Sequence, residues 1–254
     1  MRNIRWKSIQ SIFILAAAIT LLVGCGPQEE AQVENVPTDT EEQNIVEETD
    51  VETQPIESYF TQQEITEGDE VYQRIYGKSF PTEGEVALSD LRYLKMLYVD
   101  YDGNTCSGEM IVNAEIADAT LEIFYQLYEA KYPLASVKLV DDYGEVADDH
   151  LSMAANNTSA FCYRQVTGSQ KLSWHSFGAA IDINPVQNPY INGSRVSPPE
   201  GRNYLNRKEK GPHMIDHSDF CYKVFKAHGW KWGGDFSGDK DYQHFYKELS
   251  GVKR

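Results

Sequence analysis

The sequence predicts an α+β fold, a single folded domain with a central, mainly antiparallel sheet flanked by helices. Segments typical of strands and of helices are mixed between residues 59 and 254 without the regular βαβ order of a parallel sheet. No internal repeat is evident over the same residues. The 254-residue chain is 41% hydrophobic and 12% aromatic, which is ample for a sizeable core.

The clearest elements are a strand and the helix that follows it. Residues 108–113, GEMIVN, alternate in polarity, which predicts a strand. Residues 114–132 place apolar side chains on one helical face and therefore predict a helix. Asn113 is expected to cap this helix, and Pro133 is expected to end it.

Two further elements follow, separated by an irregular region. Residues 136–144 predict a strand and a turn, and residues 219–228 predict a second helix. Ser218 is expected to cap that helix, and Gly229 is expected to stop it. Residues 148–173 are rich in Asn, Ser, Thr and Gly, so they predict loops. Loops of that length inside a domain are usually functional or mobile.

The first 25 residues have the pattern of a secretory signal. Residues 1–10 carry three basic residues and no acid, and residues 11–23 are almost wholly apolar. The apolar run is short for a membrane span, which needs about 20 residues. The ending LVGC resembles the lipobox of bacterial lipoproteins, which implies that Cys25 is acylated and starts the mature chain. We therefore expect a lipid anchor on the outer face of a bacterial cell membrane; the alternatives are an uncleaved anchor helix and an ordinary signal peptide with a chance cysteine.

Residues 26–58 predict a disordered, acidic tether in front of a domain at residues 59–254. Between Pro27 and Ser58 there are eleven Asp and Glu residues and no Lys or Arg. Such a segment cannot bury enough apolar surface to offset the entropy of ordering, and its self-repulsion keeps it extended. The whole chain has a formal net charge of -16 and offers no basic face for phosphates, which excludes nucleic acid as a partner.

Three cysteines remain once Cys25 is assigned to the anchor: Cys106, Cys162 and Cys221. Because three is an odd number, at most one disulfide can form within the domain, and the sequence does not choose the pair. No CxxC motif is present, so a structural zinc ribbon is not expected.

The stretch SWHSFGAAIDI, residues 173–183, contains the first part of a candidate metal site. His175 and Asp182 are seven residues apart, so on one continuous strand they would point to opposite faces. The two converge only if the chain bends, and we expect Gly178 to supply the bend, with Asp182 on the strand AAIDI. Because this strand is apolar and buried, the carboxylate needs a metal or a bonded partner.

His244 is the expected third ligand, and Asp241 stands three residues before it. Residues three apart face together on a helical or tight turn, so the imidazole could reach a metal while the carboxylate reaches a metal-bound water. Two imidazoles, one carboxylate and an open position are typical of a catalytic zinc site, where the bound water has a pKa near ~7. Asp241 would then be the general base.

These stretches, with GWKWGGDF and DYQHF, resemble the zinc peptidoglycan peptidases, among them D-alanyl-D-alanine carboxypeptidases and L-alanyl-D-glutamate peptidases. In that family, S-x-H-x(6)-D provides two ligands, and a later acid-x-x-H provides the base and the third ligand. The resemblance covers about residues 110–247. It implies that His175, Asp182 and His244 bind Zn²⁺ and that Asp241 is the base.

The same resemblance implies substrate roles for two further residues. Arg164 stands where the family commonly has an arginine, which implies contact with the substrate or the developing oxyanion; pairing with an acid is the alternative. Ser173 matches the family serine, often within reach of the substrate; local capping is the alternative. The chain departs from many relatives at Tyr246, where they carry glutamate after His-Phe.

Other assignments of the site stay open from sequence alone. Asp235 or Asp239 could replace Asp241 as the base, because Asp241 could be a turn residue. His213 and His217 are four apart and would share a helical face, although the preceding Gly-Pro and the following cap favour a loop.

The residues and the resemblance together predict a lipid-anchored zinc peptidase that hydrolyses peptidoglycan stem peptides. A D-Ala-D-Ala carboxypeptidase-like activity is favoured, and L-Ala-D-Glu endopeptidase activity stays open, since the aspartate base and the Trp-Gly-Gly-Asp stretch are closer to that branch. The alternative is a non-catalytic, zinc-containing cell-wall binding lipoprotein of the same fold, and retention of Asp241 argues against it. A solute-binding lipoprotein would usually need a longer chain with two lobes.

Overall fold

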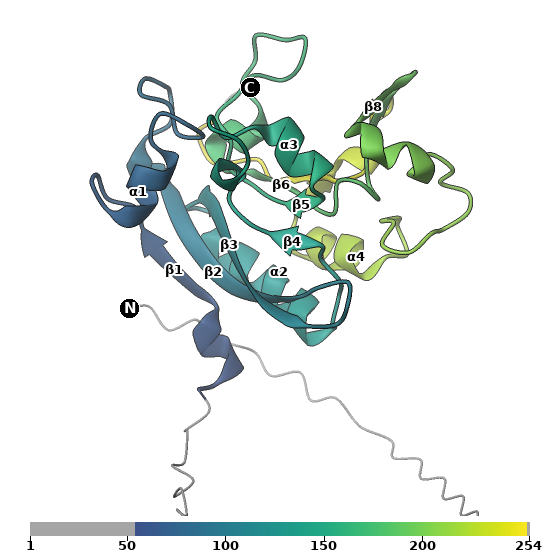
Figure 1. Ribbon diagram of the computed structural model, residues 1–254, viewed down its shortest axis with the longest axis horizontal. Coiled ribbons are helices and arrows are strands. Elements are labelled where there is room, and N and C mark those ends of the chain that lie inside the picture. Colours follow the sequence, from purple (N-terminus) through teal and green to yellow (C-terminus); the bar gives the residue numbers. More distant parts are fainter. Residues whose placement is uncertain (1–53, 253–254) are drawn as a thin grey trace, which may run out of the picture. The chain divides into compact units, whose positions relative to one another are not determined.

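The computed structural model describes residues 54–252 (Figure 1). The predicted signal peptide, Cys25 and residues 26–53 of the predicted tether lie outside the described residues. The described chain starts with a 3₁₀ turn, Ile56–Tyr59, in which Glu57 accepts a hydrogen bond from Tyr125 Oη at 3.2 Å. Phe60 follows and is buried against the rings of two tyrosines, Tyr125 and Tyr128.

A long hairpin forms the largest sheet. Strands β2 (Leu91–Val99) and β3 (Thr105–Asn113) pair antiparallel over their full length, and β1 (Thr61–Glu64) adds antiparallel to β2. The predicted strand at residues 108–113 is therefore confirmed as part of β3. The side chains of β2 that point to the core are among the most completely buried in the described chain, as at Leu91 and Leu94.

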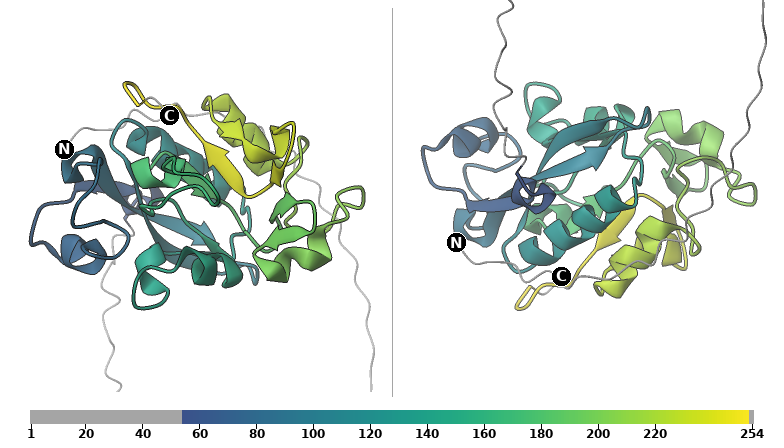
Figure 2. Two further views of the ribbon diagram at one scale, coloured as in Figure 1. Left: turned by 90° about the horizontal axis from the view of Figure 1, so that it is seen from above. Right: turned by 90° about the horizontal axis from the view of Figure 1, so that it is seen from below.

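Helix α2 (Ala117–Glu129) packs across this sheet (Figure 2). The predicted helix is confirmed, but the predicted cap is wrong, because Asn113 remains in β3. The Asn113 side chain accepts a hydrogen bond from the Glu115 N–H and donates one to the Phe177 carbonyl, so it closes the turn before the helix.

Helix α4 (Phe220–Ala227) lies beside α2. Its cap is Asp219, whose carboxylate accepts from the Cys221 N–H at 2.9 Å. The predicted cap at Ser218 is wrong, because the Ser218 hydroxyl donates to Asp216 instead. Gly229 follows the helix with a φ of 79°, which confirms the predicted stop, since the left-handed region favours glycine.

The predicted loop region contains a helix that the sequence did not reveal. Helix α3 (Asp149–Ala154) begins after Asp148, whose carboxylate accepts from the N–H groups of His150 and Leu151. The predicted strand at residues 136–144 is short, because after β4 (Ser136–Val137) the chain turns into the 3₁₀ turn Val140–Asp142.

The remaining elements are short. They are α1 (Glu70–Ile75), β5 (Asn157–Thr158), β6 (Ala180–Asp182), β7 (Tyr190–Asn192), β8 (Arg195–Ser197), β9 (Lys231–Trp232), β10 (Lys240–Asp241), β11 (His244–Tyr246) and the 3₁₀ turns Leu88–Asp90, Trp174–Phe177, Pro199–Tyr204 and Gly233–Asp235. Two three-stranded antiparallel sheets arise from them, in the orders β6-β11-β9 and β10-β7-β8. The named strands of the described chain pair in parallel only between β4 and β5.

These pairings confirm the predicted α+β class with mainly antiparallel strands. Within residues 54–252, no helix is long and apolar enough to cross a membrane. The three cysteines of this part of the chain, Cys106, Cys162 and Cys221, are all free thiols.

Candidate metal centre and cleft

His175 lies in the 3₁₀ turn Trp174–Phe177, which ends at Gly178 in the left-handed conformation, with a φ of 63°. A Cβ atom at Gly178 would lie 2.6 Å from the Asn113 backbone nitrogen, so only glycine fits both the conformation and the space. The bend that the sequence predicts between His175 and Asp182 is therefore present, and the chain leaves it directly into β6.

Asp182 and His244 meet because of strand register. Asp182 is the last residue of β6, and it lies opposite His244, the first residue of β11, in the antiparallel pair. Side chains of directly opposite residues project from the same face of a sheet. We call this sheet, β6-β11-β9, the ligand sheet.

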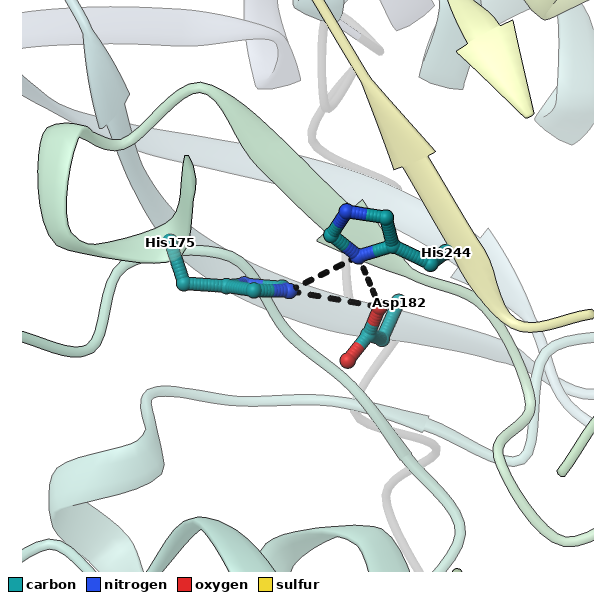
Figure 3. A group of neighbouring side chains, drawn as sticks. All are labelled: His175, Asp182 and His244. Atoms are coloured by element: carbon teal, nitrogen blue, oxygen red, sulfur yellow. Dashed lines mark hydrogen bonds and ion pairs between the residues drawn. The ribbon is translucent and has the colours of Figure 1, made fainter. Parts of the chain in front are cut away.

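The three side chains converge on one point (Figure 3). His175 Nε2 is 3.1 Å from His244 Nδ1 and 3.3 Å from Asp182 Oδ1, and His244 Nδ1 is 3.1 Å from the same carboxylate oxygen. His175 and Asp182 are each 2% exposed, and His244 is 9% exposed. Within residues 54–252, this is the one group of three or more His, Cys, Asp or Glu side chains spaced for a metal ion.

The donor set fits a zinc ion. Tetrahedral zinc with bonds of about 2.0–2.1 Å would place its ligand atoms about 3.3–3.4 Å apart, close to the spacing here. His175 Nδ1 lies 2.5 Å from the Ala160 carbonyl oxygen. Because a carbonyl only accepts, Nδ1 carries the proton and Nε2 presents its lone pair to the other two side chains.

The electrostatics of the cluster also favour a cation. Burial raises the pKa of Asp182, but the two histidines lower it by more, so the net pKa lies far below its usual range. Burial lowers the pKa of His175, yet the Asp182 carboxylate outweighs burial and the net pKa is raised. The buried site therefore concentrates a carboxylate charge that a cation would balance.

His175, Asp182 and His244 line one cleft. Asp241 lines the same cleft from the sheet β10-β7-β8, which we call the base sheet. Its Oδ1 atom is buried and has no hydrogen-bond partner among the described residues. Burial raises the pKa of Asp241 to about 7, although the nearby His244 opposes this. A carboxyl with that pKa can take up and release a proton near neutral pH.

The sequence predicts a helical or tight turn between Asp241 and His244, and the structure has no helical turn there but a bend between two short strands. Strand β10 ends at Asp241, the chain bends at residues 242–243, and β11 begins at His244. The bend is held by the Trp232 indole, which donates to the Tyr242 carbonyl at 2.8 Å. Asp241 and His244 therefore approach one cleft from two short strands, because the bend cancels the alternation that would separate them on one strand.

The alternative bases and ligands have other partners. Asp235 lies 2.7 Å from His217 Nε2, and Asp239 accepts hydrogen bonds from Tyr190 and Asn192. His213 stacks on Tyr101 with ring centroids 4.0 Å apart, whereas His217 contacts Asp235. The two histidines of the rival pair thus lie in different environments, in the loop that the sequence predicts.

Arg164 and Ser173 both line the cleft, and each also has a local partner. Arg164 Nε lies 2.7 Å from Asp149 Oδ2, an ion pair in which the N–H is not aligned for a hydrogen bond. The Ser173 hydroxyl accepts from the His175 N–H at 3.3 Å and so caps the turn that carries the histidine. Their substrate contacts stay predictions.

Tyr246, the departure from many relatives, stacks between two cleft residues. Its ring lies 5.6 Å from the His244 ring and 5.9 Å from the Trp174 ring, nearly parallel to both. An aromatic side chain therefore packs against the His244 ring at the position where many relatives have a carboxylate.

The cleft has a volume of about 610 Å³ and includes residues that sequence reasoning missed. Tyr190 and Arg195 reach it from the hairpin of β7 and β8, and Lys78 reaches it from the loop after α1. The Gly193-Ser194 pair forms the two-residue hairpin turn, and such a pair is a recognised hairpin signal that could have located this element. No comparable signal marks Lys78.

A buried cluster of two imidazoles and one carboxylate beside an unpartnered acid is an arrangement typical of metal-dependent hydrolases. Residues 167–247 match the family model described as D-alanyl-D-alanine carboxypeptidase, which confirms the resemblance that the motifs predict. The matched segment contains His175, Asp182, Asp241 and His244. Family match and site together support a peptidase-like function. Comparison with curated proteins and with solved structures found no match.

Proposed function

We propose that this chain is a zinc-dependent peptidase that hydrolyses peptidoglycan stem peptides at the bacterial cell wall. The observation that carries the proposal is the convergence of three metal-ligating atoms within 3.1–3.3 Å of one another, in the same cleft as the carboxylate of Asp241. The family match supports the substrate class.

His175, Asp182 and His244 would hold the zinc ion. Bound there, zinc would supply a Lewis acid for the peptide carbonyl and would lower the pKa of a water molecule to about 7. The hydrogen bond from His175 Nδ1 to the Ala160 carbonyl fixes the ring orientation that this ligand needs.

Asp241 would move the proton. As the water oxygen forms its bond to the carbonyl carbon, the Asp241 carboxylate accepts the water proton. The same carboxyl then delivers the proton to the amide nitrogen as the carbon–nitrogen bond breaks, so that a carboxylic acid and an amine leave. The raised pKa of Asp241, about 7, suits both halves of this exchange.

Arg164 and Ser173 are the proposed substrate contacts from the resemblance. In the cleft, Arg164 can approach a substrate carboxylate or the developing oxyanion beside its partner Asp149. We favour a D-Ala-D-Ala carboxypeptidase-like activity, with L-Ala-D-Glu cleavage as the second mode. We further propose that Cys25 carries the lipid that attaches the protein to the outer face of the membrane.

Digestion of purified muropeptides by the zinc-loaded protein tests this proposal. Mass spectrometry of the products distinguishes loss of one alanine from release of the whole stem peptide, and a chelator is the control. We expect chelator-sensitive cleavage of one of these two bonds. If zinc binds stoichiometrically but no muropeptide is cut, the non-catalytic binding lipoprotein replaces the peptidase.

A further inference from the structure

Three lysine and arginine side chains line the cleft, and they differ in what balances their charge: Lys78, Arg164 and Arg195. Arg164 forms the ion pair with Asp149 at 2.7 Å. Lys78 acts on the carboxylate of the buried Asp141, where its positive charge opposes the rise in pKa that burial causes. Arg195 is exposed, and its guanidinium has no hydrogen bond or ion pair within the described chain.

The base sheet fixes where Arg195 lies relative to the proposed base. Asp241 is opposite Tyr190 in the pair of β10 and β7, and Tyr190 is opposite Ser197 in the pair of β7 and β8. These three side chains form a row, and all three line the cleft. Arg195 is two residues before Ser197, so it projects from the same face, whereas Val196 between them is buried.

The register gives an approximate separation. Two strand spacings place β8 about 10 Å from β10, and two residues along a strand add about 7 Å. An extended peptide advances about 3.3–3.6 Å per residue. A substrate strand that has its cleaved bond beside Asp241 therefore brings a group about three residues from that bond within reach of Arg195.

The acid nearest in this arrangement does not neutralise Arg195. Asp239 is bound by the Tyr190 hydroxyl at 2.6 Å and by the Asn192 amide at 2.7 Å. Asn192 is the residue opposite Arg195 in the hairpin, so β7 binds the carboxylate of Asp239, which precedes β10, while the Arg195 guanidinium on β8 stays unpaired. Arg195 thus presents a permanent positive charge to whatever occupies the cleft.

We propose that Arg195 is a specificity-determining residue that binds a carboxylate of an acidic peptide substrate, about three residues or fewer from the cleaved bond. This inference rests on the proposed peptidase function and narrows its substrate class. The guanidinium fork matches a carboxylate with two parallel hydrogen bonds. Such a contact holds equally in the ground state and the transition state, so it acts on KM rather than on kcat.

The test compares a synthetic stem peptide that carries free carboxylates with two analogues, each with one non-scissile carboxylate converted to the amide. For the wild-type protein loaded with zinc, we expect one of the amides to raise KM about tenfold with kcat unchanged. Arg195→Ala should raise KM for the acidic peptide by the same factor and should change nothing for that amide. Arg202→Ala is the matched control, an exposed arginine outside the cleft.

Two outcomes separate this inference from the proposed function. In the first outcome, the wild type cleaves the peptides, and Arg195→Ala has the wild-type KM for the acidic peptide and the wild-type KM for each amide. The specificity role of Arg195 is then overturned, while the peptidase function stands. If no peptide is cleaved, calorimetric binding of the same peptides decides: loss of affinity on Arg195→Ala that is confined to acidic peptides supports the carboxylate site, while equal affinity overturns it. An equal KM increase for acid and both amides would also overturn it.

Discussion

The ligand sheet and the base sheet contribute to one cleft, but they hold their side chains in different ways. In the ligand sheet, Asp182 and His244 contact each other, and His175 joins them from the adjacent turn. In the base sheet, Asp241 Oδ1 and the Arg195 guanidinium lack such partners within the described chain. The candidate metal site is preformed, whereas the groups that would face water and substrate have no hydrogen-bond or ion-pair partners of their own.

The difference has a physical reason. A buried, ionised carboxylate without partners costs several kcal/mol, so the ligands must be mutually satisfied or bound to a cation. A base and a substrate contact need free lone pairs or N–H groups at the moment of reaction. Their placement on short strands at a cleft gives access, and strand pairing keeps them oriented.

The largest expected effect comes from breaking the ligand sheet's cluster. His175→Ala removes one of three ligands and leaves Asp182 and His244 without their common partner, so we expect zinc content to fall well below stoichiometric and cleavage to be lost. Metal analysis and muropeptide digestion measure the two effects. His213→Ala is the control, because His213 stacks on Tyr101 away from the cluster. Full zinc occupancy in His175→Ala would contradict the assignment.

Asp241→Ala distinguishes most clearly between the role of the ligand sheet in zinc binding and the role of the base sheet in catalysis. Because Asp241 lies outside the three-ligand cluster, we expect zinc content to stay near stoichiometric while kcat falls at least about 100-fold through loss of the general base. Asp239→Ala is the matched control two residues earlier in the chain, because the Asp239 carboxylate is already bound by Tyr190 and Asn192. Activity that survives in Asp241→Ala but not in Asp239→Ala would move the base to Asp239.

Gly233→Ala tests how tightly the base is positioned. A Cβ atom at Gly233 would lie 2.5 Å from the Asp241 carbonyl oxygen and 2.7 Å from its Cβ, so Asp241 must shift. Displacement of a catalytic group by about 1 Å can cost about 100-fold in rate. We expect kcat to fall by about that factor with zinc content retained. Gly238→Ala is the control, because a Cβ there meets nothing within 4 Å; equal kcat in both variants would show that Asp241 tolerates movement.

The smallest expected effect concerns the stability of the metal-free protein. The pKa of Asp241 is raised to about 7 in the folded state, whereas in the unfolded state it is about 4. Between these two pH values the folded state keeps the carboxyl protonated, while the unfolded state ionises it. The resulting loss of stability grows as pH rises from about 4 to about 7 and is constant above. We expect the Tm of Asp241→Asn, relative to wild type, to rise by up to about 10 °C over that range. A pH-independent difference would contradict the raised pKa.

Much of the ligand sheet's chemistry could be predicted from sequence. The spacing of His175 and Asp182 requires a bend, and Gly178 provides it, so the residues themselves encode the geometry. The base sheet is harder to predict, because strands of two or three residues show no measurable alternation. The sequence therefore predicts only a helical or tight turn from Asp241 to His244 and does not show the two short strands, although both side chains do reach the cleft.

The remaining errors have local causes. Asn113 and Ser218 are both good helix caps by residue type, but the Asn113 side chain bonds Phe177 and Glu115, and the Ser218 hydroxyl bonds Asp216. These competing partners come from the tertiary structure or from a preceding turn, so propensity alone does not show them. Arg195 could not be identified from sequence, because only the tertiary structure shows that its guanidinium lines the cleft without an acidic partner.

The register between β6 and β11 also bears on how the chain can vary through evolution. Opposite placement of Asp182 and His244 depends on this one pairing, and slipping it by a single residue would turn the imidazole to the other face of the sheet. This pairing does not depend on the number of residues between β6 and β11. Insertions and deletions at the turn between β7 and β8 can therefore remodel one wall of the cleft while the pairing of Asp182 with His244 is kept.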